Sequence, residues 1–288
     1  YNDTSNSPGF PVRFSSPNGL AVASDGTIYV TENGNSVIRR IVRHSDGTVT
    51  VDTFAGTALV LSKTLQTNRQ DTLVGLPGQL DGPILQSQIR QPDDIVIGPD
   101  GTIYFSDSSN EDVRRIVQTP NGPVIQTIAG SGVPGFADGA GTSARFNTPT
   151  GIALSPDGKF LYVADFGNNL IRRVDLATSM VDTLSGTGDA GTADGPAGLS
   201  NFDGPIGLAC DTDGTIYVVE FANNDIRVVD PAGDANTFAG GGTSRYRDGA
   251  GITAHFQGPR GIAIDTVNRL LYIADFDNFA IRRIQLPQ

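Results

Sequence analysis

Apolar residues occur along this chain in short runs, separated by segments rich in Gly, Pro, Asn and Asp. The third quarter is representative, with apolar runs at 151–154, 160–165, 170–174 and 179–184. Runs of this length, rich in β-branched and aromatic residues and bounded by turn residues, predict β-strands. No amphipathic helix of useful length is predicted.

The same succession of strands recurs five times. Each copy begins with a proline, a variable residue, a small or acidic residue and an aliphatic pair, and the five prolines are spaced by 75, 57, 56 and 54 residues. They are Pro17, Pro92, Pro149, Pro205 and Pro259. A near-constant period indicates one supersecondary unit that is copied and stacked, and four short antiparallel strands per copy describe a propeller blade. We therefore predict an all-β propeller of four-stranded antiparallel blades in one domain, residues 1–288.

Two irregularities leave alternatives open. Residues 57–74 have no counterpart in the other copies; we interpret them as a surface loop insertion, with a lid or partner contact as the alternative. The last copy stops after its third strand. We expect five blades, with residues 1–13 supplying the missing outer strand, or six blades if the chain is a fragment.

A carboxylate ends the second strand of every copy, and an arginine follows seven residues later, across a hairpin turn. The pairs are Glu32 and Arg39, Asp107 and Arg114, Asp165 and Arg172, Glu220 and Arg227, and Asp275 and Arg282. Such a ring resembles a metal funnel or an acid–base array, but catalysis needs one site whereas a scaffold needs one per copy. We interpret the pairs as structural and predict no catalytic residue and no metal ligand.

Candidate binding residues are found where the copies differ. The residue after the carboxylate is Asn33 or Ser108 in the early copies and Phe166, Phe221 or Phe276 in the later ones. Because these turns share one face near the central channel, the three rings can stack on a sugar or grip an apolar partner. The alternative is that they pack under adjoining loops. Variable loop positions on the same face add Arg13, Arg145, Asn201 and His255.

Composition narrows the function classes. The net charge is −11, which argues against nucleic acid and against an anionic membrane surface. No apolar run approaches the roughly 20 residues needed to span a bilayer. The lone Cys210 is expected to be a buried, inert thiol. The two histidines, His44 and His255, are too few for a His-rich zinc site.

The repeated blocks resemble NHL-repeat β-propellers. The matching motifs are Gly-Ile-Ala, Ile/Leu-Tyr-Val-x-Asp/Glu, Asn-x-x-Ile-Arg-Arg and Asp-Gly-x-Gly-x-x-Ala-x-Phe, and they cover nearly the whole chain. The resemblance implies the propeller fold. It implies no single function, because that family contains enzymes, ligand-binding sensor domains, RNA binders and extracellular adhesion modules.

These observations favour a non-enzymatic module, without a cofactor, that binds a protein or glycan through one propeller face. The low lysine content, the acidic charge and the acceptor pattern at Asn2 for a glycan favour an extracellular or cell-surface setting. An open last blade would permit self-assembly by strand addition. The alternative is a calcium-dependent enzyme of the lactonase or hydrolase type, with carboxylate and Asn ligands.

Overall fold

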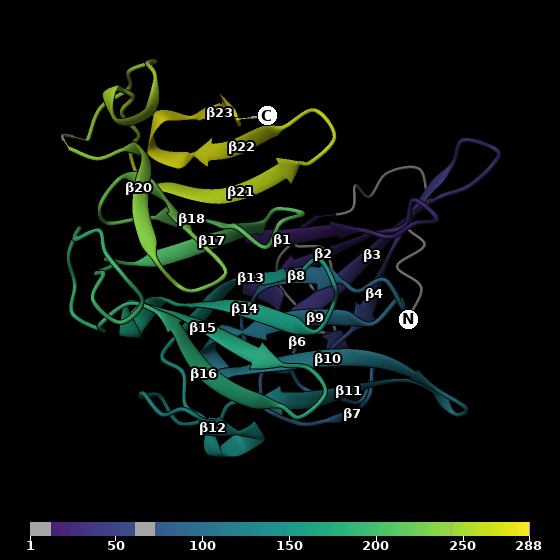
Figure 1. Cartoon of the computed structure of the whole chain (residues 1–288). Coiled ribbons are helices and arrows are strands. Elements are labelled where there is room, and N and C mark those ends of the chain that lie inside the picture. The colour runs from purple at the N-terminus through teal and green to yellow at the C-terminus, as the bar shows by residue number, and fades with distance from the viewer. Residues whose placement is uncertain (1–12, 61–72, 243, 288) are drawn as a thin grey trace, which may run out of the picture. The chain divides into compact units, whose positions relative to one another are not determined.

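The computed structural model describes residues 13–60, 73–242 and 244–287. Apart from a separate two-stranded hairpin, the strands in these ranges form five antiparallel sheets, and the helical segments are single 3-10 turns (Figure 1). The chain divides into two compact units, Tyr1–Ile128 and Ala129–Gln288.

The first unit contains two blades. Blade 1 pairs four strands in chain order: β1 (Pro17–Val22), β2 (Ile28–Glu32), β3 (Val37–Arg43) and β4 (Val49–Ala55). Blade 2 does the same with β8 (Pro92–Ile97), β9 (Ile103–Asp107), β10 (Asp112–Thr119) and β11 (Gly122–Ala129), and it adds β7 (Gly82–Pro83) outside β11. The inserted segment begins and ends in a hairpin of β5 (Ala58–Val60) and β6 (Leu73–Gly75). Residues 61–72 lie outside the described part.

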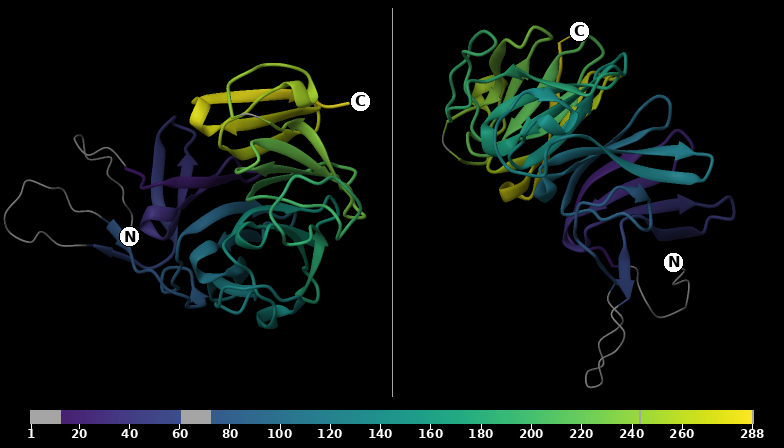
Figure 2. Two further views of the ribbon diagram at one scale, coloured as in Figure 1. Left: turned by 90° about the vertical axis from the view of Figure 1, so that its left-hand side faces the viewer. Right: turned by 90° about the horizontal axis from the view of Figure 1, so that it is seen from below.

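The second unit contains three blades, shown from two further sides in Figure 2. Blade 3 is β13 (Pro149–Leu154), β14 (Phe160–Asp165), β15 (Leu170–Asp175) and β16 (Met180–Ser185), with β12 (Gly139–Ala140) outside β16. Blade 4 is β17 (Pro205–Cys210), β18 (Ile216–Glu220), β19 (Asp225–Val229) and β20 (Ala235–Gly240). Blade 5 is β21 (Pro259–Asp265), β22 (Leu270–Asp275) and β23 (Ala280–Gln285).

Six 3-10 turns connect these strands. Four of them follow the second strand of a blade: η1 (Asn33–Asn35), η2 (Ser108–Asn110), η4 (Phe166–Asn168) and η6 (Phe276–Asn278). The other two, η3 (Gly141–Ser143) and η5 (Gly251–Thr253), lie in the long connections between blades. In these four blades, the residue after the second-strand carboxylate is thus the first residue of a 3-10 turn.

The predicted all-β propeller of five blades is confirmed, with three strands in blade 5. The strand expected from residues 1–13 falls almost entirely on residues 1–12, which lie outside the described part. Closure of the ring and the single-domain assignment stay predictions.

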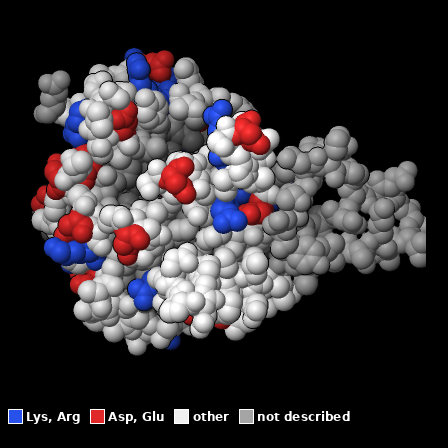
Figure 3. Space-filling model, turned by 90° about the vertical axis from the view of Figure 1, so that its right-hand side faces the viewer, with Lys and Arg blue, Asp and Glu red and all other residues white. Residues whose placement is uncertain are grey.

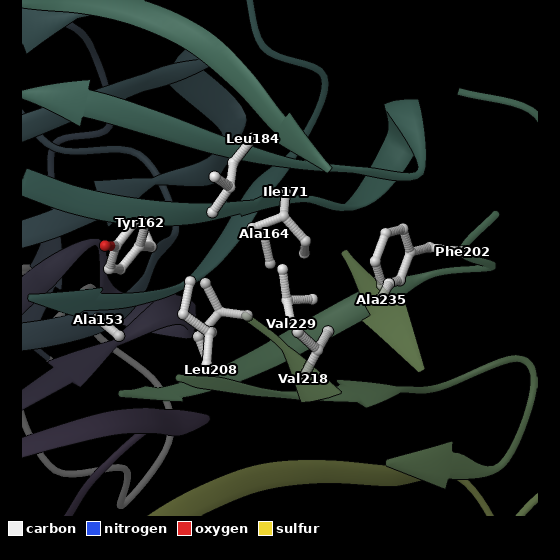
Figure 4. Packing of buried hydrophobic residues seen from close by; sticks show 11 residues of the cluster. Ala153, Tyr162, Ala164, Ile171, Leu184, Phe202, Leu208, Val218, Val229 and Ala235 are labelled. Atoms are coloured by element: carbon white, nitrogen blue, oxygen red, sulfur yellow. The ribbon is translucent and has the colours of Figure 1, made fainter. Parts of the chain in front are cut away.

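Neighbouring blades are held together by apolar side chains that both contribute. Between blades 3 and 4, Ile171 and Leu184 of blade 3 pack with Leu208 and Val218 of blade 4 (Figure 4). Phe202, three residues before the blade 4 proline, joins this cluster and is fully buried. Phe256 occupies the corresponding position between blades 4 and 5. Burial between stacked sheets therefore explains the recurring aromatic residue before the proline.

The glycine in the Pro-x-Gly-Ile-Ala block allows the innermost strands to approach closely. A Cβ added at Gly151 would collide with the backbone oxygen of Ile206, and one at Gly207 with that of Arg260. Backbone atoms cannot move aside as a flexible side chain can, so a larger residue would separate β13 from β17 or β17 from β21. The repeat thus encodes the spacing of the blades in this unit.

We expect Phe202→Ala to lower the free energy of unfolding of the second unit by about 3–5 kcal/mol, because it removes a buried ring and leaves a cavity. The control is Phe276→Ala, since Phe276 is 55% exposed. It should cost less than about 1 kcal/mol. Urea unfolding followed by circular dichroism measures both changes in a chain without tryptophan. Equal losses would contradict the assignment of Phe202 to the interblade core.

Candidate functional site

Each second-strand carboxylate lies against its repeat arginine. In blade 3, Nη1 of Arg172 is 2.7 Å from Oδ2 of Asp165, and both side chains are fully buried. Arg172 sits on β15 directly opposite Val163 of the neighbouring strand, which brings its guanidinium toward the end of β14. The corresponding distances in blades 1, 2, 4 and 5 are 3.4, 3.0, 3.0 and 2.8 Å. All five predicted pairs are therefore in contact.

The carboxylates are also engaged by two further donors. In blade 3, the backbone N–H of Asn147 donates to Oδ1 of Asp165 at 2.8 Å, and Nδ2 of Asn168 donates to Oδ2 at 2.9 Å. The other four blades repeat both bonds, with asparagines Asn35, Asn110, Asn223 and Asn278. Sequence reasoning missed these asparagines, although each follows its carboxylate by three residues. Both carboxylate oxygens of Asp165 therefore accept hydrogen bonds from the surrounding protein.

The arginines reach a second aspartate that sequence reasoning also missed. Nη2 of Arg172 lies 2.6 Å from Oδ1 of Asp138, in the loop that enters blade 3. The same guanidinium donates to the carbonyl oxygens of Arg145 and Ala137. Arg114, Arg227 and Arg282 bind Asp81, Asp194 and Asp248 in the same way. The signal in the sequence is an Asp-Gly pair that precedes each of these arginines by 33 or 34 residues.

We expect Arg172→Met to lower the free energy of unfolding by about 3–5 kcal/mol, because it leaves the carboxylate of Asp165 buried without its cation. Burial already raises the pKa of Asp165. The neighbour Arg173 is a matched control, since its pair with Asp182 is partly exposed, with 32% of the Arg173 side chain accessible. Arg173→Met should cost about 1 kcal/mol or less. Chemical unfolding of the two variants would give the same loss if the buried pair had no special role.

Blades 2 and 4 bury one additional acid each. Asp112 and Asp225 begin the third strand, where blades 1, 3 and 5 have Val37, Leu170 and Ala280. Burial, together with the neighbouring Glu220 carboxylate, raises the pKa of Asp225 to about 8. Burial likewise raises the pKa of Asp112 well above its usual range. Near neutral pH, Asp225 is therefore a protonated carboxyl that can donate to Glu220.

This arrangement predicts a pH-dependent stability. The folded pKa of Asp225 lies above its unfolded value, so the contribution of the neutral carboxyl is complete below about pH 4 and is lost as the pH rises through about 8. Asp225→Asn keeps a donor toward Glu220 without the charge. We expect the variant to exceed the unchanged chain in unfolding free energy by more than about 1.4 kcal/mol at pH 9, the equivalent of one pKa unit.

Below about pH 4 the difference should disappear or reverse, as measured by urea unfolding between about pH 3 and pH 9. Asp189→Asn, at an exposed acid of the same unit, is the control and should leave the pH profile unchanged. A pH-independent difference for Asp225→Asn would contradict the titration of this group.

The three predicted phenylalanines lie at the same position of successive blades in the second unit. Phe166 and Phe221 are half-buried, and each packs against a glycine of the following blade. A Cβ added at Gly204 would lie 3.1 Å from the Phe166 ring, and one at Gly258 would lie 3.3 Å from the Phe221 ring. Packing against the next blade thus accounts for much of the surface of these two rings.

Phe276 differs because it is 55% exposed. The guanidinium of Arg260 lies over both the Phe221 ring, at 4.8 Å from the centroid, and the Phe276 ring, at 4.6 Å. Phe279, at the left-handed end of η6 with φ 54°, is 97% exposed. We define Phe221, Arg260 and Phe276 as the aromatic rim. The sequence analysis did not single out Arg260. It differs from its counterparts in the other blades of this unit, which are Thr150 and Ile206.

The polar loop candidates do not join the aromatic rim. Arg145 and His255 form two-residue backbone bridges with Ala137 and Arg247, and their carbonyl oxygens accept from the repeat arginines. The Asn201 side chain donates to Thr187 within its own loop. Arg13 belongs to the first unit, and Asn2 lies outside the described residues. The contacts of Arg145 and His255 are thus made by backbone atoms, and their side chains stay binding candidates of the prediction.

The sequence also predicts an inert Cys210 thiol and no metal ligand. Burial raises the pKa of the Cys210 thiol to about 12, which makes it a poor nucleophile near neutral pH. Among the described residues, no group of three or more His, Cys, Asp or Glu side chains comes together in a way that could hold a metal ion.

On the face in Figure 3, acidic and basic side chains are interspersed. In the described ranges, no helix is long and apolar enough to cross a membrane.

Comparison with known proteins identifies the family. A family model described as SMP-30/Gluconolactonase/LRE-like region matches residues 83–238, more than half of the chain. The chain belongs to this family. An NHL repeat model matches residues 14–41, so the resemblance to NHL-repeat propellers is confirmed.

Two relatives of this chain are much longer proteins. Protein SUPPRESSOR OF QUENCHING 1, chloroplastic, of Arabidopsis thaliana is 28% identical over 286 residues, which cover 95% of this chain and 25% of that protein. NHL repeat-containing protein 2 of Bos taurus is 34% identical over 141 residues, covering 46% of this chain and 19% of that protein. The chain therefore spans a quarter or less of the length of these relatives.

Similar solved structures show the fold alone, because their sequence identities are below 25%. A chain of a nidogen/laminin complex has a TM-score of 0.59 at 16% identity, covering 94% of this chain and 76% of that one. An auxiliary nutrient binding protein from Bacteroides thetaiotaomicron also has a TM-score of 0.59, at 17% identity, with coverages of 94% and 69%. A streptogramin B lyase has a TM-score of 0.51 at 16% identity, with coverages of 97% and 86%.

Proposed function

We propose that this chain is a non-enzymatic binding module whose aromatic rim contacts a carboxylate-bearing protein or glycan. The observation that carries this proposal is the position of Arg260 between the rings of Phe221 and Phe276. The Arg260 side chain is exposed and has no hydrogen bond or ion pair within the described residues. The two rings thus position a guanidinium whose N–H donors make no hydrogen bond within the described residues.

The geometry suits recognition of an anion beside an apolar surface. Stacking occupies the faces of a guanidinium and leaves its in-plane N–H donors for a carboxylate or for sugar hydroxyls. The exposed ring of Phe276 supplies an adjacent surface on which a sugar ring or an apolar side chain can stack. The acidic charge of the chain and the candidate acceptor at Asn2 support an extracellular or cell-surface setting.

The second candidate function is that of a calcium-dependent lactonase or hydrolase. The family match favours it, since gluconolactonase is part of the family description. Against it stands the engagement of the five repeat carboxylates, each bound by an arginine, an asparagine and a backbone N–H. We therefore place the binding module first.

An array of neutral and acidic glycans and of acidic peptides, probed with the full chain, tests the first proposal. We expect saturable binding to carboxylate-bearing probes, weakened at least tenfold by Arg260→Ala or Phe276→Ala. The matched control is Phe136→Ala, because Phe136 is 57% exposed and also lies over an arginine, Arg172. Binding that is absent, or is lost equally in the Phe136 variant, would contradict the role of the aromatic rim.

Hydrolysis of glucono-1,5-lactone, with calcium or with a chelator, separates the two candidates. For a binding module we expect the uncatalysed rate under both conditions. A calcium-dependent, chelator-sensitive rate that survives Arg260→Ala would overturn the non-enzymatic assignment in favour of the lactonase type.

A further inference from the structure

A crevice of about 400 Å³ lies between blades 1 and 2 of the first unit. Blade 1 forms one wall, which includes Tyr29, Arg40 and Phe54. Blade 2 forms the other wall with Leu85 of its entry loop and with residues 118 and 123 of the β10–β11 hairpin. All of the lining residues belong to the first unit, whereas the aromatic rim belongs to the second.

Two departures from the repeated pattern accompany this crevice. β10 and β11 are eight residues long and form an extended hairpin (Figure 1), whereas β15, β16, β19 and β20 have five or six residues. In blade 3, the guanidinium of Arg173 lies over the Phe160 ring, at 5.2 Å from its centroid. The position of Phe160 is taken by the smaller Thr27 in blade 1. These departures distinguish blades 1 and 2 from blades 3 and 4.

An ion pair of zero net charge lines the blade 1 wall. Arg40 stands opposite Tyr29 on one neighbouring strand and opposite Asp52 on the other, so the three side chains form a row on one face of the blade. Nε of Arg40 donates to Oδ1 of Asp52 at 3.1 Å, and Nη2 donates to Oδ2 at 2.6 Å. The two side chains are 39% and 20% exposed. Nη1 of Arg40 and further lone pairs of the carboxylate therefore stay available to a ligand.

The crevice also combines unused polar groups with apolar surface. The Tyr29 hydroxyl and the Gln118 amide make no hydrogen bond within the described residues. Burial raises the pKa of Tyr29, so its hydroxyl is a protonated donor near neutral pH. The Phe54 ring packs edge-on against the Tyr29 ring, with 4.7 Å between centroids, and Leu85 is 47% exposed. A ligand in the crevice therefore meets hydrogen-bonding groups on one side and apolar groups on the other.

The ion pair indicates which class of ligand suits the crevice. An anion is repelled by Asp52 and a cation by Arg40, so a charged ligand gains little from the pair as a whole. An apolar ligand would cover the pair and the Tyr29 hydroxyl without giving hydrogen bonds in return, which is costly. A neutral ligand with several adjacent hydroxyls and one apolar face satisfies both conditions, and a pyranose sugar is such a ligand.

We infer that the crevice between blades 1 and 2 binds a neutral sugar. Neighbouring hydroxyls of the sugar bond to the adjacent donors and acceptors of Arg40 and Asp52, and a further one bonds to the Tyr29 hydroxyl. The apolar face of the sugar lies against Leu85 and Pro123, as is usual for pockets in which a few polar groups fix the ligand's orientation. The crevice and the aromatic rim thus take ligands of different charge.

Ligand-observed NMR by saturation transfer, with the full chain and the methyl glycosides of glucose, galactose, mannose and N-acetylglucosamine, tests this inference. We expect at least one of them to bind saturably, with a dissociation constant on the order of 1 mM. Asp52→Asn should weaken binding about tenfold, because hydrogen bonds to a charged group are lost. The matched control is Asp182→Asn, which changes the same two-bond contact with Arg173 in blade 3 and should leave binding unchanged.

A second pair of variants keeps the test independent of folding defects. Tyr29→Phe removes only a hydroxyl and should weaken binding about fivefold, the effect of one hydrogen bond. Tyr162→Phe makes the same change at the corresponding position of blade 3 and should have no effect on binding. Arg260→Ala should also leave neutral-sugar binding unchanged, so the crevice and the aromatic rim are tested separately.

Three results would overturn the inference. The first is the absence of saturable binding for all four glycosides up to tens of millimolar. The second is equal weakening by the blade 1 variants and their blade 3 controls, because the sugar would then bind elsewhere. The third is that only an acidic sugar or a peptide binds in a way that Tyr29→Phe weakens, because the crevice would then take another class of ligand.

Discussion

Every described blade depends on a buried guanidinium. Arg172, Arg227 and Arg114 each join the carboxylate of one strand, the aspartate of the entry loop and two loop carbonyls, with the arginine side chain fully buried. An arginine is suited to this because its planar fork carries five donors in fixed directions. The entry loop is long and rich in glycine, and this contact adds to its short backbone pairing with the outer strand in blades 2 and 3.

The same interaction limits the chemistry that the carboxylates can perform. A buried carboxylate that accepts from an arginine, an asparagine and a backbone N–H is committed to the fold. Asp112 and Asp225 differ from these carboxylates. Each is a second acid that is buried beside a carboxylate–arginine pair, and burial raises its pKa. These acids make stability sensitive to pH in two blades without adding an accessible catalytic group.

The binding role that we propose therefore rests on a residue outside the repeated pattern. In the second unit, the guanidinium of Arg260 lies over the rings of Phe221 and Phe276, and its side chain has no hydrogen bond or ion pair within the described residues. Thr150 and Ile206 stand at its position in the other two blades of this unit. Arg260 thus combines polar donors with an adjacent aromatic surface.

The sequence alone determined the five repeats, the strand order within each and the pairing of each carboxylate with an arginine seven residues later, and it left six blades as an alternative. These features are local or repeated, so turn residues, apolar runs and a constant spacing are enough to reveal them. Asn168 was within reach of the same reasoning, since it follows Asp165 by three residues. Asp138 is 34 residues from Arg172, and only tertiary packing decides which loop carboxylate reaches a buried guanidinium. The same holds for Arg260 and Phe221, which belong to different blades: their contact depends on how blades 4 and 5 pack side by side, a geometry that no spacing along the chain contains.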